Sequence, residues 1–183
     1  MDSRLRGNDG LRKRWPKRTL DASRLPSDSR LMSIDDRLAE LGLTLPQPAA
    51  PVAAYVPTVQ AGGLLHVSGQ LPFRDGALMT GRCGEDVDDA FAQEAAERCG
   101  IMLLAQIKGA LGTLDRVARI VKLGVFVNST PDFTGQPKIA NGASELMQKV
   151  FGEAGKHARS AVGVASLPLG AVVEVDAVVA IGG

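Results

Sequence analysis

The fold of this chain is decided by one stretch near the C-terminus, HARSAVGVASLPLGAVVEVDAVVAI, residues 157–181. Its apolar residues alternate with small or polar ones, which is typical of β-strands with one buried face. Pro168 and Gly170 interrupt the alternation and mark a short turn. The stretch therefore predicts two strands joined by that turn.

The alternation also groups the residues that can do chemistry. Side chains point to opposite faces along a strand, so Arg159, Ala161 and Gly163 share one side of the first strand. The two small residues leave space beside a guanidinium, a group that binds a carboxylate through two parallel hydrogen bonds. In the second strand Glu174 and Asp176 share one side, with valines and an alanine opposite them.

The same stretch resembles the C-terminal signature of the RidA family of reactive intermediate deaminases, also called the YjgF or L-PSP endoribonuclease family. Further segments agree with that family in the same order, and the resemblance covers roughly residues 52–181. The segments are Tyr55, Val67-Ser68-Gly69-Gln70-Leu71-Pro72, and Asp132-Phe133 followed by Asn141.

The resemblance implies a site that hydrolyses 2-imino or 2-enamino acids to 2-keto acids and ammonia, with no metal and no cofactor. Arg159 would clamp the substrate carboxylate, and Asp176 would hold the hydrolytic water near the imine carbon. The other residues that it places at the substrate are Tyr55, Gly69, Asn141 and Glu174. Active sites in this family lie between the subunits of a homotrimer, which implies the same arrangement here.

The chain departs from the family pattern at two of these positions. The family commonly has glutamate where Asp176 stands, and many relatives have a cysteine where this chain has Ala161. These departures keep open a second function, a catalytically quiet protein that binds a small carboxylate. An endoribonuclease is the third alternative, and the acidic balance of the folded region argues against strong binding to nucleic acid.

Read without the resemblance, each residue also has a purely structural interpretation. Arg159 could be a surface or ion-paired arginine, and the two acids could only solvate an edge strand. Tyr55 could be a packing residue, and Asn141 a solvated position on a helix. The histidines, His66 and His157, lack the three or four ligands that a zinc site requires.

Patterns along residues 32–183 predict a single α+β domain. A mixed sheet would carry its helices on one face, as in RidA-like or chorismate-mutase-like folds. The other face also carries apolar residues, and the resemblance implies that a trimeric barrel covers it. The predicted strands are 52–59, 64–69, 117–127 and the two C-terminal ones. The predicted helices are a short one capped by Ser33 and ended by Gly42, then 86–111 and 137–151.

Residues 1–31 form a basic leader that is predicted to be disordered, because it has little apolar material to bury. It carries nine basic and four acidic residues, a net charge of +5, so the chain's net charge of +1 leaves −4 for residues 32–183. A nucleic-acid arm and a transit peptide are alternative interpretations. Met32 looks like a natural start, which would make the leader an over-extended reading of the gene.

The composition is that of a globular protein without a membrane anchor. No apolar run approaches the roughly 20 residues of a membrane span. The two cysteines, Cys83 and Cys99, have no metal or redox spacing, which predicts free thiols in a reducing cytoplasm. The expected partners are a small imino or enamino acid, or another small carboxylate, and further copies of the chain.

Overall fold

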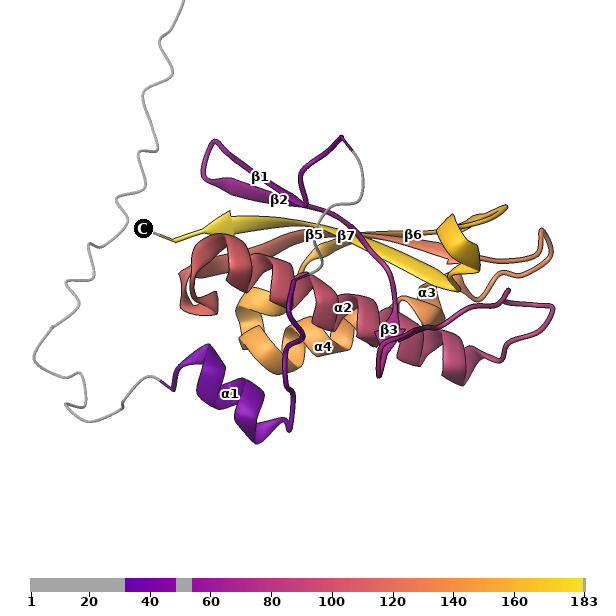
Figure 1. Cartoon of the computed structure of the whole chain (residues 1–183), viewed down its shortest axis with the longest axis horizontal. Helices are drawn as coiled ribbons and strands as arrows, with labels where there is room; N and C mark the ends of the chain where they lie inside the picture. The colour runs from indigo at the N-terminus through magenta and orange to yellow at the C-terminus, as the bar shows by residue number, and fades with distance from the viewer. Residues whose placement is uncertain (1–31, 49–53, 183) are drawn as a thin grey trace, which may run out of the picture. The chain divides into compact units, whose positions relative to one another are not determined.

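A computed structural model describes residues 32–48 and 54–182. A five-stranded mixed sheet with the order β1-β2-β7-β5-β6 carries the helices on one face (Figure 1), which confirms the predicted α+β class. The sheet strands are β1 (Thr58–Ala61), β2 (Leu64–Gln70), β5 (Val117–Asn128), β6 (Ala158–Val164) and β7 (Val173–Ile181). The helices are α1 (Ile34–Glu40), α2 (Asp89–Leu111), α3 (Gln136–Ile139) and α4 (Asn141–Phe151).

The two C-terminal strands do not pair with each other. Strand β5 lies between them, parallel to β6 and antiparallel to β7. The predicted turn is a short 3₁₀ segment, Pro168–Gly170, and the connection passes the end of β5. Here the Asn128 amide donates to the carbonyl of Val172 (3.0 Å). The strands and the turn are thus as predicted. The two strands are not adjacent in the sheet, because each pairs with β5.

The three largest differences from the predicted element boundaries are at β1, α2 and the helix predicted over 137–151. Strand β1 begins at Thr58 because Pro57 has no amide to donate, and residues 52 and 53 of the predicted strand lie outside the described residues. Helix α2 begins three residues late because Asp88 caps it, accepting from the Phe91 amide (2.8 Å). The helix predicted over 137–151 is divided at Ala140 into α3 and α4.

The hydrophobic core lies between the sheet and the helices. Strand β7 shows the predicted alternation, with its valines at 173, 175 and 179 buried and Glu174 and Asp176 half-buried on the other face. The helical side of the core comes mainly from α2 and α4. Fully burying one such aliphatic side chain contributes roughly 1.5–3 kcal/mol. Its largest buried members include Leu103, Leu104, Ile107, Leu146 and Met147.

Short elements complete the domain. Helix α1 has a capping box in which Ser33 and Asp36 bond each other's backbone amides, as the predicted cap at Ser33 required. Strands β3 (Phe73–Arg74) and β4 (Ala77–Leu78) form a small hairpin. The 3₁₀ helices η2 (Leu114–Arg116) and η3 (Gly152–Gly155) follow α2 and α4.

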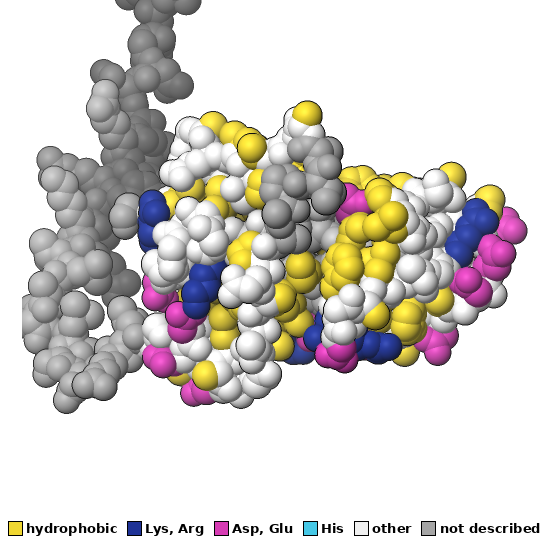
Figure 2. All heavy atoms as spheres, viewed as in Figure 1, with side chains coloured by type: hydrophobic (Ala, Val, Ile, Leu, Met, Phe, Trp, Pro, Cys, Tyr) yellow, Lys and Arg dark blue, Asp and Glu magenta, His cyan; other side chains and the backbone are white. Residues whose placement is uncertain are grey.

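Charged and apolar side chains are unevenly distributed over the surface. Figure 2 shows that Lys, Arg, Asp and Glu side chains on the face in view lie mainly along the helical side and at both ends of the part drawn in colour. On the sheet face that the helices leave open, Val162 is 46% exposed. Within the described residues, no helix is long and apolar enough to cross a membrane. The predicted leader, 1–31, lies outside them.

Both cysteines of the chain are buried in the core. Burial raises the pKa of Cys83 to about 11, with Asp89 and Asp86 adding to the effect. Burial also raises the pKa of Cys99 well above its usual value. Neither thiol is therefore a reactive thiolate at neutral pH.

Candidate functional site

Arg159 lies on the edge strand β6, and its side chain points toward the helices. It is in register with Leu123 of β5, which is fully buried on the helical side of the sheet. The guanidinium reaches the junction of α3 and α4. Nη1 donates to Asn141 Oδ1 (3.0 Å) and to Ser144 Oγ (2.9 Å), and Nη2 donates to the carbonyl oxygen of Pro137 (3.1 Å). Two predicted site residues, Arg159 and Asn141, thus lie in one cluster.

This cluster leaves part of the Arg159 guanidinium available. A guanidinium has five N–H donors, and the three hydrogen bonds above occupy Nη1 and one side of Nη2. Nε–H and one Nη2–H have no acceptor among the described residues, and two donors of a guanidinium can bind the two oxygens of a carboxylate. All three partners are uncharged, and among the described residues no carboxylate pairs with Arg159. Its positive charge is therefore not cancelled locally.

Asn141 is held in place because α4 packs tightly against α2. A side chain at Gly142 would overlap the carbonyl of Gln93 in α2, so only glycine allows this approach. Asn141 is the first residue of α4 and is fixed beside β6 by the same contact. Ser144 follows three residues later and so faces the same way on the helix.

The two predicted acids lie over glycines of neighbouring strands. A side chain at Gly69 of β2 would overlap Glu174 Oε1, and one at Gly124 of β5 would overlap Asp176 Oδ1. Gly69 lies where the register of β2 and β7 shifts, at a β-bulge. Two glycines therefore provide the space that these carboxylates occupy.

The two carboxylates differ in their surroundings. Asp176 Oδ1 accepts the Gly124 amide at 3.0 Å, so this acid is partly engaged with the backbone. Glu174 has no hydrogen-bond partner among the described residues. Burial and, second, the charge of Asp176 raise the pKa of Glu174. A carboxylate with a raised pKa and unoccupied oxygens is better suited to exchange a proton with water.

Arg159 and the two acids lie on opposite faces of the sheet. Asp176 is in register with Gly124, and Arg159 with the next residue, Leu123, so their side chains point in opposite directions. Strand β5 also separates β6 from β7. One chain therefore does not bring Arg159 and Glu174 together.

Tyr55 lies just before residues that are tied to the part of β2 containing Gly69. It precedes β1 and is 51% exposed. The segment after it is fixed to β2, because Ser68 Oγ donates to the Val56 carbonyl (3.1 Å) and the Ser68 amide to that of Pro57 (2.9 Å). Tyr55, Gly69 and Glu174 thus lie around β2 and β7. Arg159 and Asn141 lie at β6 and α4.

Sequence reasoning missed two members of the Arg159 cluster. Ser144 contacts Arg159 directly, and its spacing of three from Asn141 on a helix was a signal that could have found it. From the sequence, His157 was considered only as a possible zinc ligand, yet its ring nitrogen Nε2 lies 3.1 Å from Ser144 Oγ. Ala161, where relatives have a cysteine, is half-buried on the same side of β6 as Arg159.

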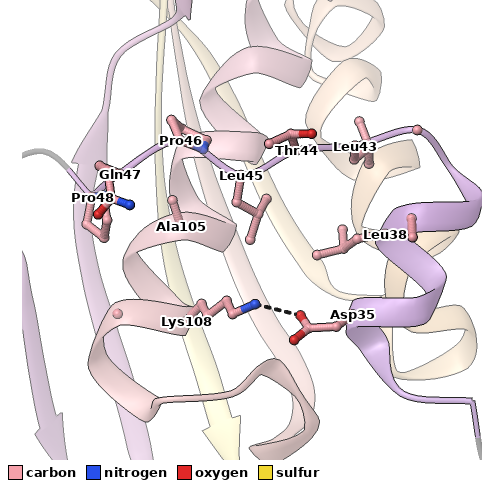
Figure 3. Close-up of a pocket in the computed structure, with 13 residues that line it drawn as sticks. Asp35, Leu38, Leu43, Thr44, Leu45, Pro46, Gln47, Pro48, Ala105 and Lys108 are labelled. Atoms are coloured by element: carbon pink, nitrogen blue, oxygen red, sulfur yellow. Dashed lines mark hydrogen bonds and ion pairs between the residues drawn. The ribbon is translucent and has the colours of Figure 1, made fainter.

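A cavity away from these groups contains none of the predicted site residues. Its volume is about 730 Å³, and it lies between α1, α2 and residues 42–48. Figure 3 shows Leu38 and Leu45 projecting into it, with Lys108 and Asp35 paired across it at 2.8 Å. Its walls combine polar and apolar groups in about equal measure. We place the candidate site instead at the Arg159 cluster and at the two acids Glu174 and Asp176. The charges of these groups are not neutralised by an ion pair among the described residues, whereas Lys108 and Asp35 neutralise each other.

No group of three or more His, Cys, Asp or Glu residues is placed to hold a metal ion within residues 32–48 and 54–182. His66 lies exposed on β2 and His157 at the start of β6. The candidate site is thus built from a guanidinium, amide and hydroxyl groups, and two carboxylates.

Comparison with known proteins gives a consistent result. A model of the family described as "YjgF/chorismate_mutase-like, putative endoribonuclease" matches residues 35–180. Protein TCP17 of Trypanosoma cruzi is 56% identical over 144 residues, which cover 78% of this chain and 90% of that protein. The crystal structure of Atu1372 from Agrobacterium tumefaciens, a protein of unknown function, is 53% identical with a TM-score of 0.76, over 81% of this chain and 92% of that one. A 2-iminobutanoate/2-iminopropanoate deaminase of Dermatophagoides farinae is 29% identical over 141 residues, 76% of this chain and 94% of that protein.

Proposed function

Because this chain belongs to the YjgF/chorismate-mutase-like family, we propose that it hydrolyses reactive 2-imino and 2-enamino acids to 2-keto acids and ammonia. The observation that carries the proposal is the Arg159 guanidinium, which has two N–H donors without an acceptor among the described residues and no charged partner there. The relative from Dermatophagoides farinae bears the name of such a deaminase, which supports this substrate class.

In the proposed reaction Arg159 binds the substrate carboxylate and orients the imine carbon. Glu174 holds a water molecule and takes one of its protons as the oxygen attacks the carbon of the imine, which enters in its protonated form. Glu174 then returns that proton to the nitrogen. The resulting tetrahedral adduct loses ammonia as its C–N bond breaks, and the carbonyl of the keto acid forms. We assign the water-holding role to Glu174 in place of Asp176, because Asp176 already accepts the Gly124 amide. General acid–base help of this kind contributes roughly 10²- to 10⁴-fold.

We further propose that each site forms between two chains of a homotrimer. Arg159 and Asn141 of one chain would meet Tyr55, Gly69 and Glu174 of its neighbour. The opposite orientation of Arg159 and Glu174 within one chain supports this arrangement. The open sheet face supports it too, because Val162 there is apolar and exposed.

The test is a coupled assay in which threonine dehydratase generates the imine and the rate of 2-oxobutanoate formation is followed with and without this protein. Acceleration is expected. No acceleration with a protein that still binds 2-oxobutanoate would instead favour the second function, a carboxylate-binding protein without turnover. RNA cleavage without imine hydrolysis would favour the third.

Subunit mixing tests where the site forms. Arg159→Ala and Glu174→Gln proteins should each be inactive alone. Unfolded together in equal amounts and refolded, they should regain about one quarter of wild-type activity. In a head-to-tail ring a site is intact only where a chain with Arg159 meets a neighbour with Glu174, and random mixing places that pair at one site in four. A site built within one chain would regain none.

A further inference from the structure

His157 is connected to Arg159 through Ser144. The Nδ1 atom of His157 lies 2.6 Å from the carbonyl oxygen of Gly155, and Nε2 lies 3.1 Å from Ser144 Oγ. A carbonyl oxygen can only accept, so Nδ1 carries the hydrogen in the neutral ring. Nε2 then has a lone pair, and the Ser144 hydroxyl donates to it.

The hydroxyl of Ser144 also accepts a hydrogen bond from Arg159 Nη1 at 2.9 Å. The hydrogens therefore point one way along the whole chain of bonds, from guanidinium to hydroxyl to imidazole. With His157 neutral, Ser144 holds the Arg159 guanidinium against α4. With His157 protonated, Nε2 becomes a donor, the hydroxyl loses its acceptor, and two cations face one oxygen.

We propose that His157, acting through Ser144, is a positioning residue for Arg159, and that its protonation makes Arg159 more available to a carboxylate. The proposal rests on the proposed function for the carboxylate that Arg159 binds. It goes beyond that function by adding two residues and a coupling between carboxylate binding and a proton.

The charges around His157 agree with this coupling. Burial lowers the pKa of His157 most strongly, the hydrogen bond to Gly155 opposes this, and the positive charge of Arg159 lowers it further. The other charged groups on the packed elements are engaged or exposed. Lys156 pairs with Glu153 (2.7 Å), Arg119 of β5 donates to the Lys156 carbonyl (3.0 Å), and Glu145 of α4 is exposed.

The sign of the effect follows from reciprocity. The protonated form of His157 is penalised by Arg159, and a carboxylate bound to Arg159 relieves that penalty. Binding therefore raises the pKa of His157, and protonation of His157 must tighten binding by the same factor. A rise of half a pKa unit corresponds to roughly a threefold gain in affinity. Binding should become tighter as pH falls below the ordinary value for histidine.

The first measurement needs no ligand. With ¹³C-labelled histidine, NMR titration of the full chain follows two residues, His66 and His157, and the exposed His66 serves as an internal control. Removing the neighbouring cation in Arg159→Gln should raise the pKa of His157. An unchanged His157 pKa in Arg159→Gln would overturn the connection, whatever the protein catalyses.

The second measurement uses 2-oxobutanoate as the probe, with calorimetry at pH 5.5 and 7.5. The raised pKa of Glu174 can add a pH dependence of its own. Wild type is therefore compared with His157→Gln, which keeps an amide donor and acceptor but no titrating group. The wild type should gain at least about threefold more affinity at low pH than His157→Gln does. Ser144→Ala should lose this excess and Ser144→Thr should keep it.

The outcomes separate the two proposals. Equal pH dependence of binding in wild type and His157→Gln would overturn the coupling. Absence of 2-oxobutanoate binding at both pH values would count against the proposed function, while the ligand-free titration still decides whether His157 acts on Arg159.

Discussion

Replacing Arg159 by lysine should lower kcat/KM for an imino acid by about 10- to 100-fold without unfolding the protein. A lysine ammonium has three donors and no planar fork. The acceptors around Arg159 are Asn141 Oδ1, Ser144 Oγ and the Pro137 carbonyl, and satisfying all three would leave none for a substrate. Losing one of two charge-assisted bonds to the carboxylate costs roughly 1.5–3 kcal/mol.

Arg159→Ala should reduce activity further, because no cation then remains to hold the carboxylate. The fold should tolerate this change, since Asn141 is half-buried and the Pro137 contact is exposed, so water can replace the guanidinium. We expect a cost of about 1 kcal/mol, or roughly 2–4 °C in Tm for a domain of this size.

The assay is imine hydrolysis coupled to threonine dehydratase, with a melting curve on the same preparations. Arg119→Lys is the matched control, because Arg119 also bonds a carbonyl oxygen, that of Lys156, and lies outside the candidate site. It should keep full activity. Wild-type activity in Arg159→Ala would refute the clamp, and loss of the folded state would assign Arg159 a structural role.

Five further predictions concern other parts of the chain. Glu174→Gln should reduce turnover at least about 100-fold and Asp176→Asn far less, and the reverse order would restore Asp176 as the water holder. The raised pKa of Glu174 means that the folded state binds this proton more tightly than the unfolded state. Stability should therefore fall as pH rises through that pKa, and Glu174→Gln should remove this dependence in urea unfolding at pH 5 and pH 8. Gly69→Ala should lower kcat without changing the oligomeric mass, because the added methyl group would displace Glu174; unchanged kinetics would contradict this. Light scattering at micromolar concentration should give the mass of a trimer, and a monomer mass would rule out the shared site. Deleting residues 1–31 should leave Tm unchanged, and a clear fall in Tm would contradict the predicted disorder.

Much of the fold could be predicted because local patterns agree with it. The alternation in residues 173–179 predicted which side chains of β7 are buried, and Ser33 predicted the start of α1. The start of β1 was wrong because apolar residues before Pro57 look like a strand, although proline cannot donate to one. The order of strands depends on long-range pairing, which a local pattern does not contain.

The candidate site could be predicted as a set of residues but not as an arrangement. Alternation assigned Arg159 and Glu174 to a side of their own strands. Only the register with Leu123 and Gly124 of β5 shows that the two sides are opposite. Likewise, the greater engagement of Asp176 depends on the Gly124 amide, a contact between distant residues. The sequence therefore identified both acids as candidates, and the hydrogen bond to Gly124 distinguishes Asp176 from Glu174.

The burial of both native thiols makes this protein convenient to label. Cys83 and Cys99 are the chain's two cysteines, and burial keeps them protonated and shielded from maleimides. Ala161 lies two residues from Arg159 on the same side of β6, at a half-buried position. A cysteine placed there would be modified selectively, so a single fluorophore could report on occupancy of the Arg159 cluster without removing any native residue elsewhere.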